Sequence, residues 1–399
     1  MESPPIFIVG VQRSGTTLLS AMLAAHSRMS CGPETHFFQR LAFENIENLV
    51  NPVHWPKNAL DFIKSITFTN FTANTSQRIS ILEKYHRSEQ QIYEYLKDQQ
   101  PGVPAILNSI VLPYMHSLKK SRWVEKTPDH IKHLGLVREY FPDSPIIRII
   151  RDPRDVALSL MNVPWGAKTF FEAIDYWKRM DELSNEFFTK DQCSYTLRFE
   201  DLVAETEFEL KKLCEFLGEN YEKSMLNTST TGKQVNSQDV PWKKKVEQPV
   251  DKNRAYSWKN HLSDEMIRYT EGIIGIHLLR YGYPLTGNFP YLGEYFPKQI
   301  HFHFYSKKVS LIAENGIRFW KKETEEKPVA TIFFGEPMKS KYFGTNILDR
   351  IKTIAYILKI LIQTIVKKRT LYWLISEENQ KFNGIGNKFL SILLKPFQL

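Results

Sequence analysis

The sequence contains few cysteines. Cys31, Cys193 and Cys214 are the only ones in 399 residues, and their number and spacing exclude a disulfide framework and a zinc site. No His/Cys spacing in the sequence indicates another metal site either. We therefore expect three buried thiols, a reducing compartment and no metal requirement.

Long hydrophobic runs are also missing. The N-terminus, MESPPIFIVG, has neither the basic region nor the apolar stretch of a secretory signal peptide. Residues 350–369, RIKTIAYILKILIQTIVKKR, are interrupted by lysines. Their longest uncharged run, Ile360–Val366, is far below the roughly 18 residues expected of a membrane-spanning helix. These absences predict a cytoplasmic protein.

Most of the chain has no excess of positive or negative charge. Residues 1–300 hold 36 basic and 36 acidic residues, whereas residues 301–399 hold 17 Lys/Arg and 8 Asp/Glu. A neutral body argues against a nucleic-acid groove, so we expect no nucleic-acid partner. As a helix, residues 350–369 would have a broad apolar face with basic edges. Such a helix can pack on the protein, lie peripherally on a membrane or form an oligomer contact, and the oligomeric state stays open.

What the sequence does contain is a repeated order of strand, loop and helix. Ile6–Val9 reads as a buried strand and Thr16–Ala25 as the helix after it. The segments SRWVEKTPDHI, SPIIRIIRDPRDVALSLM and YTLRFEDLVAETEFELKKLCEFLG repeat this order. We predict an α/β fold with a P-loop-like, doubly wound parallel sheet flanked by helices. Its ligands should bind at the carboxyl ends of the strands.

The composition also suggests a domain division. Residues 1–287 are predicted to form the catalytic domain, with a mainly helical insertion at about 37–120 that caps the sheet. A helix that stops at Tyr281-Gly282 closes this domain. Residues 288–399 carry scattered aromatics and lysines, which predicts a basic, partly amphipathic and mainly helical C-terminal extension.

The loop from Gly10 to Thr17, Gly-Val-Gln-Arg-Ser-Gly-Thr-Thr, has the outline of a phosphate-binding loop. It keeps the two glycines of G-x-x-x-x-G-K-[ST] but has Thr16 in place of the lysine. Backbone N–H groups and the helix N-terminus can still bind an anion. The lost lysine argues against triphosphate hydrolysis, and the guanidinium of Arg13 suits a tetrahedral oxyanion. A plain strand–helix turn packed through Gly15 is the structural alternative.

This loop resembles the 5′-phosphosulfate loop of sulfotransferases that use 3′-phosphoadenosine 5′-phosphosulfate (PAPS). In RDPRDVALS, Arg151 and Ser159 stand at the spacing with which those enzymes hold the 3′-phosphate of the nucleotide. CGPETHFF is similar to a segment of the tyrosylprotein and bacterial enzymes, and WVEKTPDHI to the family's Lys-Thr-Pro segment. The resemblance covers about residues 5–285 and implies the P-loop-like fold and sulfuryl transfer.

The resemblance also implies a role for each site residue. Glu34 would be the general base, and Lys126 and Arg13 would stabilise charge on the transferring group. The residues implied in binding the donor are Arg13, Ser14, Gly15, Thr16, Thr17, Arg151 and Ser159. The segment before Trp258 lacks the Arg-Lys-Gly element that cytosolic family members use on the 3′-phosphate, and Ser257, Lys259 or Arg254 could replace it.

Some of these assignments have alternatives. His130 and His36 are alternative bases, because imidazole is the side chain used most often near neutral pH. A helix-terminal carboxylate is the structural alternative for Glu34, and a solvated lysine in a turn is the one for Lys126. Phe199 stands where the family has a tyrosine, so only stacking on the nucleotide could remain there.

We therefore predict a PAPS-dependent sulfotransferase that transfers a sulfuryl group to a hydroxyl or amine by in-line displacement. The expected acceptor is a small molecule, lipid or carbohydrate. The alternative enzyme is a P-loop kinase or other NTP-dependent transferase, which Thr16 and the Arg151/Ser159 pair disfavour. The alternative of another class is a non-catalytic nucleotide-binding protein, which the presence of both Glu34 and Lys126 disfavours.

Overall fold

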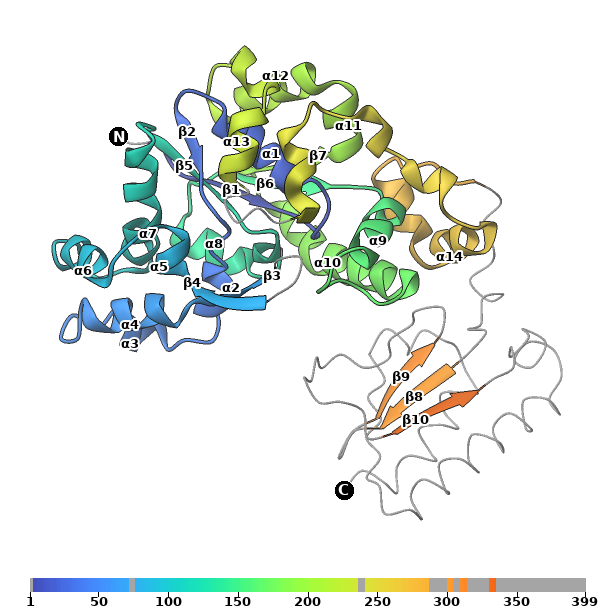
Figure 1. The fold of residues 1–399 in the computed structure, drawn as a ribbon, viewed down its shortest axis with the longest axis horizontal. Helices are drawn as coiled ribbons and strands as arrows, with labels where there is room; N and C mark the ends of the chain where they lie inside the picture. Colours follow the sequence, from blue (N-terminus) through green and yellow to red (C-terminus); the bar gives the residue numbers. More distant parts are fainter. Residues whose placement is uncertain are drawn as a thin grey trace. The chain divides into compact units, whose positions relative to one another are not determined.

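The structure is a computed structural model (Figure 1). It describes residues 3–71, 76–235 and 241–286, and the backbone of residues 300–304, 309–313 and 330–334. The chain divides into two compact units, one formed by Met1–Ala167 and Tyr176–Leu262 and the other by Lys168–Asp175 and Ser263–Leu399. All the predicted site residues lie in the first unit.

A five-stranded parallel sheet forms the centre of the first unit (Figure 1). Its strands, in spatial order, are β2 (Met29–Cys31), β5 (Arg122–Lys126), β1 (Ile6–Val9), β6 (Ile146–Ile150) and β7 (Ser194–Arg198). The strands on both sides of β1 come later in the chain, so the strand order reverses at β1. Ligands bind at such a switch point in open parallel sheets, and the predicted phosphate loop follows β1.

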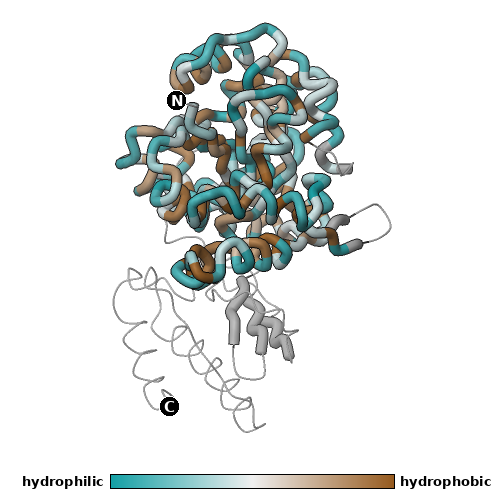
Figure 2. The backbone as a smooth tube through the Cα atoms, turned by 90° about the vertical axis from the view of Figure 1, so that its left-hand side faces the viewer, coloured by the Kyte–Doolittle hydropathy of each residue, from teal (hydrophilic) through white to brown (hydrophobic). Residues whose placement is uncertain are grey.

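Alternate side chains of β1 are buried on opposite faces of the sheet. Ile6 and Ile8 belong to a hydrophobic core that includes residues of α1 (Thr16–Ala24), α11 (Phe199–Ala204), α12 (Thr206–Leu217) and α13 (Ser229–Val235). Phe7 makes edge contacts on the other face with Phe38, Trp123 and Phe141, at ring-centroid distances of 5.9, 5.6 and 5.2 Å. Burying each large apolar side chain contributes about 1.5–3 kcal/mol. Hydrophobic stretches run through this unit while hydrophilic residues occupy many outer loops (Figure 2).

The segment between β2 and β5 is mainly helical. Its helices are α2 (Phe37–Leu41), α3 (Ile46–Leu49), α4 (Lys57–Ser65), α5 (Ile81–Lys84), α6 (Glu89–Lys97) and α7 (Val103–Ser117). An antiparallel hairpin of β3 (Thr67–Phe71) and β4 (Ser76–Ser80) interrupts them. The sequence analysis did not predict this hairpin, because its strands are short and mostly polar. It places Phe68 beside the loop that follows β2.

Four further helices complete the framework around the sheet: η1 (Pro128–Lys132), α8 (Leu134–Tyr140), α9 (Pro153–Met161) and α10 (Phe170–Lys190). After α12 the chain returns to α1 through η2 (Lys223–Leu226), α13 and η3 (Pro241–Glu247). It then contacts α11 with η4 (Lys252–Arg254) and α9 with η5 (Ser257–Asn260). This return brings Trp242 and Arg254 to the phosphate loop and Ser257 to α9.

The second unit contains the predicted closing helix, α14 (Asp264–Arg280), whose C-cap residue is Tyr281. Beyond it, β8 (Ile300–Phe304) pairs antiparallel with β9 (Val309–Ala313) and β10 (Ala330–Phe334). The described residues of the extension thus form strands where the sequence analysis expected mainly helix, and the β-branched and aromatic residues of IHFHF, VSLIA and ATIFF favour this structure. The amphipathic segment 350–369 and the boundary at residue 287 lie outside the described residues.

No helix in the described part of the chain is long and apolar enough to cross a membrane.

Candidate active site

The loop between β1 and α1 is shaped by two residues with positive φ. Arg13 has φ +72° and Gly15 has φ +102°. A Cβ at Gly15 would lie 2.4 Å from Cδ2 of Phe199, so a larger residue would require the core to move. No side chain caps α1, which leaves its first backbone N–H groups available to a ligand. The geometry therefore suits an anion at this helix end.

Two polar groups beside this loop lack internal partners. The hydroxyl of Ser14, which is fully buried, has no hydrogen-bond partner among the described residues. The same is true of Nε of Arg151, a residue that is 5% exposed. A buried donor without a partner is costly, by about 1–3 kcal/mol. A bound anion that accepts from both groups would remove this cost.

Three arginines converge at the same place. One nitrogen of Arg151 donates to the carbonyl of Arg13 at 3.3 Å and the other to the carbonyl of Arg254 at 2.8 Å. Burial, followed by the charges of Arg254 and Arg151, lowers the pKa of Arg13 to about 10. Burial and the charge of Arg151 also lower the pKa of Arg254. Like charges held this close together favour a negatively charged ligand.

Ser159 joins the cluster as its spacing from Arg151 predicts. Helix α9 begins at Pro153 with Asp152 as its N-cap, which directs Ser159 toward the loop. There Nε of Arg13 donates to Oγ of Ser159 at 3.1 Å, and another nitrogen of Arg13 donates to the carbonyl of Trp242 at 3.2 Å. The structure thus brings together Arg13, Arg151 and Ser159.

Ser257 lies nearby but is engaged elsewhere. Its hydroxyl donates to Oδ1 of Asp155 at 2.7 Å, and the backbone N–H of Trp258 donates to the same oxygen at 2.8 Å. Ser257 therefore holds the start of η5 against α9. Of the three alternatives left open by the sequence, Arg254 is the one whose charge is coupled to those of Arg13 and Arg151.

Phe199 does not offer a stacking surface. Its side chain is fully buried behind Gly15. The guanidinium carbons of Arg151 and Arg254 lie 4.6 and 5.7 Å from its ring centroid, within the range of cation–π attraction. The remaining role that the sequence suggested, stacking on a nucleotide, is therefore wrong, and the ring supports the two arginines instead.

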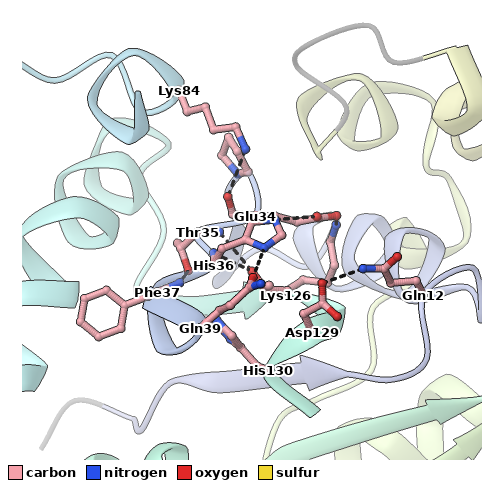
Figure 3. Close-up of polar contacts among 12 residues, drawn as sticks. Gln12, Glu34, Thr35, His36, Phe37, Gln39, Lys84, Lys126, Asp129 and His130 are labelled. Atoms are coloured by element: carbon pink, nitrogen blue, oxygen red, sulfur yellow. Dashed lines mark hydrogen bonds and ion pairs between the residues drawn. The ribbon is translucent and has the colours of Figure 1, made fainter. Parts of the chain in front are cut away.

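Glu34 and Lys126 form an ion pair at the carboxyl ends of β2 and β5. Nζ of Lys126 lies 2.5 Å from Oε1 of Glu34, and their side chains are 1% and 19% exposed (Figure 3). Nζ of Lys84 donates to the carbonyl of Glu34 at 3.3 Å and lies 3.5 Å from the ring centroid of Phe68. Because Lys126 is buried and paired with Glu34, the alternative of a solvated lysine is excluded.

The two histidines that the sequence left open as bases occupy different environments. His130 is fully buried, its Nε2 accepts from the backbone N–H of Phe38 at 3.3 Å, and its Nδ1 lies 3.2 Å from Oε2 of Glu125. His36 is 23% exposed and its Nε2 lies 3.5 Å from Oε2 of Glu34. His36 is thus beside Glu34, whereas His130 belongs to the scaffold beneath it.

Glu125 is a site residue that the sequence analysis missed. Burial raises its pKa, but the charge and hydrogen bond of His130 and the hydroxyls of Thr35 and Thr127 outweigh this and hold it at about 2. Thr35 and Thr127 both donate to Oε1, at 2.5 and 2.8 Å. This buried carboxylate fixes the loop that carries Glu34. A glutamate inside a strand of a central parallel sheet, directly after Trp123 and Val124, was the available signal.

Within the described part of the chain, no group of three or more His, Cys, Asp or Glu side chains is placed to hold a metal ion.

The comparison with known proteins agrees with this geometry. The profile of the sulfotransferase family matches residues 4–223, so the chain belongs to the sulfotransferase family. This finding and the parallel sheet confirm the predicted family and α/β fold.

Individual relatives are distant. Protein-tyrosine sulfotransferase A of Caenorhabditis elegans is 23% identical over 344 residues, which are 81% of this chain and 77% of the relative. Omega-hydroxy-beta-dihydromenaquinone-9 sulfotransferase Stf3 of Mycobacterium tuberculosis is 23% identical over 254 residues, 55% of this chain and 63% of the relative. Among solved structures, the sulfotransferase domain of the Synechococcus olefin synthase has 20% identity and a TM-score of 0.49, covering 72% of this chain and 98% of that domain.

Proposed function

We propose that this sulfotransferase takes its sulfuryl group from PAPS and transfers it to a hydroxyl or amine acceptor. The observation that carries the proposal is the arginine cluster of Arg13, Arg151 and Arg254, together with the donors Ser14 Oγ and Arg151 Nε, which have no partner in the described part of the chain. Guanidinium groups with free donors suit phosphate and sulfate oxygens. The phosphate groups at the two positions of PAPS carry enough negative charge to neutralise the three guanidinium groups.

The donor-binding roles divide along the loop and α9. The loop amides with Ser14, Thr16 and Thr17 would hold the 5′-phosphate at the start of α1, where Gly15 allows the close approach. Arg151 and Ser159 would hold the 3′-phosphate, and we assign Arg254 to them in place of Ser257. The 3′-phosphate contacts distinguish this donor from ordinary adenine nucleotides.

The protein's own residues then supply charge stabilisation and proton transfer. PAPS, when bound, supplies the electrophilic sulfuryl group. Glu34 takes the proton of the acceptor, a role typically worth about 10²–10⁴ in rate. Lys126 and Arg13 stabilise the negative charge that develops during transfer. Because Lys126 is buried against Glu34, its charge is poorly screened by water and acts strongly on the carboxylate of Glu34 and on the transferring group.

The acceptor site is proposed to lie beside Glu34. The names of two relatives specify protein tyrosine and a hydroxylated menaquinone, both of which present a hydroxyl. Next to Glu34, the structure places the half-buried Phe68 and the side chains of His36 and Lys84. We propose a small-molecule, lipid or carbohydrate hydroxyl as the acceptor. The cytoplasmic location and the membrane contact of residues 350–369 stay predictions.

Calorimetric titration with 3′-phosphoadenosine 5′-phosphate, compared with ATP and magnesium, tests the donor. We expect the bisphosphate to bind more tightly and Arg151→Ala to weaken it about tenfold to a hundredfold, the usual cost of a charged hydrogen bond. Arg148→Ala is a matched control, because Arg148 is also 5% exposed and on β6 but contacts Thr196 and Asp181 instead. Preference for ATP, or equal effects of the two substitutions, would contradict the proposal.

A further inference from the structure

Both carboxylate oxygens of Glu34 have partners, and the second partner can carry a proton. Oε1 lies 2.5 Å from Nζ of Lys126 and Oε2 lies 3.5 Å from Nε2 of His36 (Figure 3). In the proposed function, Glu34 gains a proton in every turnover and must lose it before the next. Because the ammonium of Lys126 covers Oε1, the proton can leave from the side that faces His36.

The ring of His36 is held in place by contacts from several elements. Its backbone has φ +50°, a conformation that costs a non-glycine residue about 1–2 kcal/mol. The backbone N–H donates to Oγ1 of Thr127 at 3.3 Å, Nδ1 lies 3.0 Å from Oε1 of Gln39, and the ring centroid is 5.3 Å from that of Phe68. Such strain persists where surrounding contacts enforce it, often at functional sites.

We propose that His36 is a positioning and proton-transfer residue that acts through Glu34; this inference rests on the proposed function. In this proposal Nδ1–H of His36 donates a hydrogen bond to Oε1 of Gln39, and Nε2 of the neutral ring has the lone pair that takes the proton from protonated Glu34. As the acceptor oxygen bonds to sulfur, its O–H bond breaks and the proton goes to Glu34. The new O–H bond of Glu34 then breaks, and the proton moves to Nε2. The ring, 23% exposed, releases it to water.

The surroundings of the ring combine negative, neutral and positive groups. The groups that face His36 are the carboxylate of Glu34, the amide of Gln39, the hydroxyl of Thr127 and the ring of Phe68. Two ammonium groups, those of Lys126 and Lys84, are bound to Glu34.

The proton on the ring of His36 provides a test that needs neither donor nor acceptor. In protein with ¹⁵N-labelled histidine, the ring nitrogen shifts show which nitrogen is protonated, and the signals lost in His36→Gln assign the residue. We expect the neutral ring to carry its proton on Nδ1. His86 is a reference, since it is exposed and also has positive φ (52°). A proton on Nε2 would overturn the proposal, because that nitrogen could not accept one from Glu34.

Turnover provides the second test, with labelled PAPS and phenol, which is protonated at neutral pH, as the probe acceptor. Glutamine can still hydrogen-bond to Glu34 but cannot carry a proton, so His36→Gln should lower kcat about tenfold to a hundredfold at unchanged KM for PAPS. Added imidazole should restore the rate, and His86→Gln should behave as wild type. An unchanged kcat, or a loss that imidazole does not restore, would overturn the proposal. The protonated ring nitrogen found by NMR tests the role of His36 without turnover. The bisphosphate titration tests the proposed function separately.

Discussion

The two halves of the candidate site differ in how their charges are satisfied. On the donor side, burial and the neighbouring arginine charges lower the pKa values of Arg13 and Arg254, and Ser14 Oγ and Arg151 Nε lack partners among the described residues. On the acceptor side, Glu34 is already paired with Lys126. On the donor side, the charges of the arginines are left for a bound anion to balance. On the acceptor side, Glu34 and Lys126 balance each other, so their ion pair must loosen when Glu34 takes a proton from the acceptor.

The largest effect, on kcat, should come from a substitution on the acceptor side of the site, at Glu34. Glu34→Gln keeps the size of the side chain but removes the base, so kcat should fall about 10²- to 10⁴-fold. The dissociation constant of the bisphosphate should change little, because the hydrogen bonds of Arg151 in the donor cluster go to the carbonyls of Arg13 and Arg254. Turnover and calorimetry on the same variant check this, and an equal loss in both would show that the halves are not separate.

A buried carboxyl behind the donor half should make stability depend on pH. Burial raises the pKa of Glu200 to about 7, above its ordinary value of 4.5. The folded protein therefore binds more protons between these values, and this contribution to stability is lost as pH rises toward and through 7. Relative to wild type, Glu200→Gln should gain about 2 kcal/mol between pH 5 and pH 8.

Urea unfolding of both proteins across this pH range measures the gain. Glutamine can still accept the backbone N–H of Asp152, which Glu200 accepts at 2.9 Å. A difference between the two proteins that stays constant with pH would show that Glu200 is ionised throughout.

The shape of the donor loop can be tested at its glycine. Gly15→Ala introduces a Cβ 2.4 Å from Phe199 at φ +102°, so it should lower the free energy of unfolding by about 2 kcal/mol and weaken bisphosphate binding. Gly135→Ala is the matched control, because a Cβ there meets nothing within 4 Å among the described residues and lies in α8. That change should be neutral or slightly stabilising in urea unfolding.

The smallest effect is expected from Arg13→Gln, which should raise the stability of the ligand-free protein while it weakens bisphosphate binding. Arg13→Gln removes a cation whose pKa burial and two arginines lower to about 10, so it should stabilise the ligand-free protein by about 1 kcal/mol. The sign follows because the folded state binds the Arg13 proton less tightly than the unfolded chain does, which costs stability at neutral pH. The same variant should bind the bisphosphate more weakly in calorimetry, and destabilisation at pH 7 would contradict this account.

Much of the site was predictable because it follows local patterns. The strand Ile6–Val9 and the helix that begins at Thr16 depend on neighbours in sequence, and both appear as expected. Arg151 and Ser159 each contact Arg13 of the loop, whereas their binding of the 3′-phosphate stays a prediction. The choice of Arg254 over Ser257 was not predictable, because short turns without periodicity carry the chain back to the loop. The pairing of Glu125 with Thr35, 90 residues apart, likewise depends on which loops meet across the sheet.

The buried ring of Phe199 touches both regions that the proposed function assigns to the anionic groups of the donor. It lies directly behind Gly15 of the loop and beneath the guanidinium groups of Arg151 and Arg254. A rigid aromatic side chain in a close-packed core cannot shift to accommodate a ligand without disturbing its neighbours. The separation between the two regions is therefore a fixed length, and a ligand with two anionic groups is selected by the distance between them as well as by their charge.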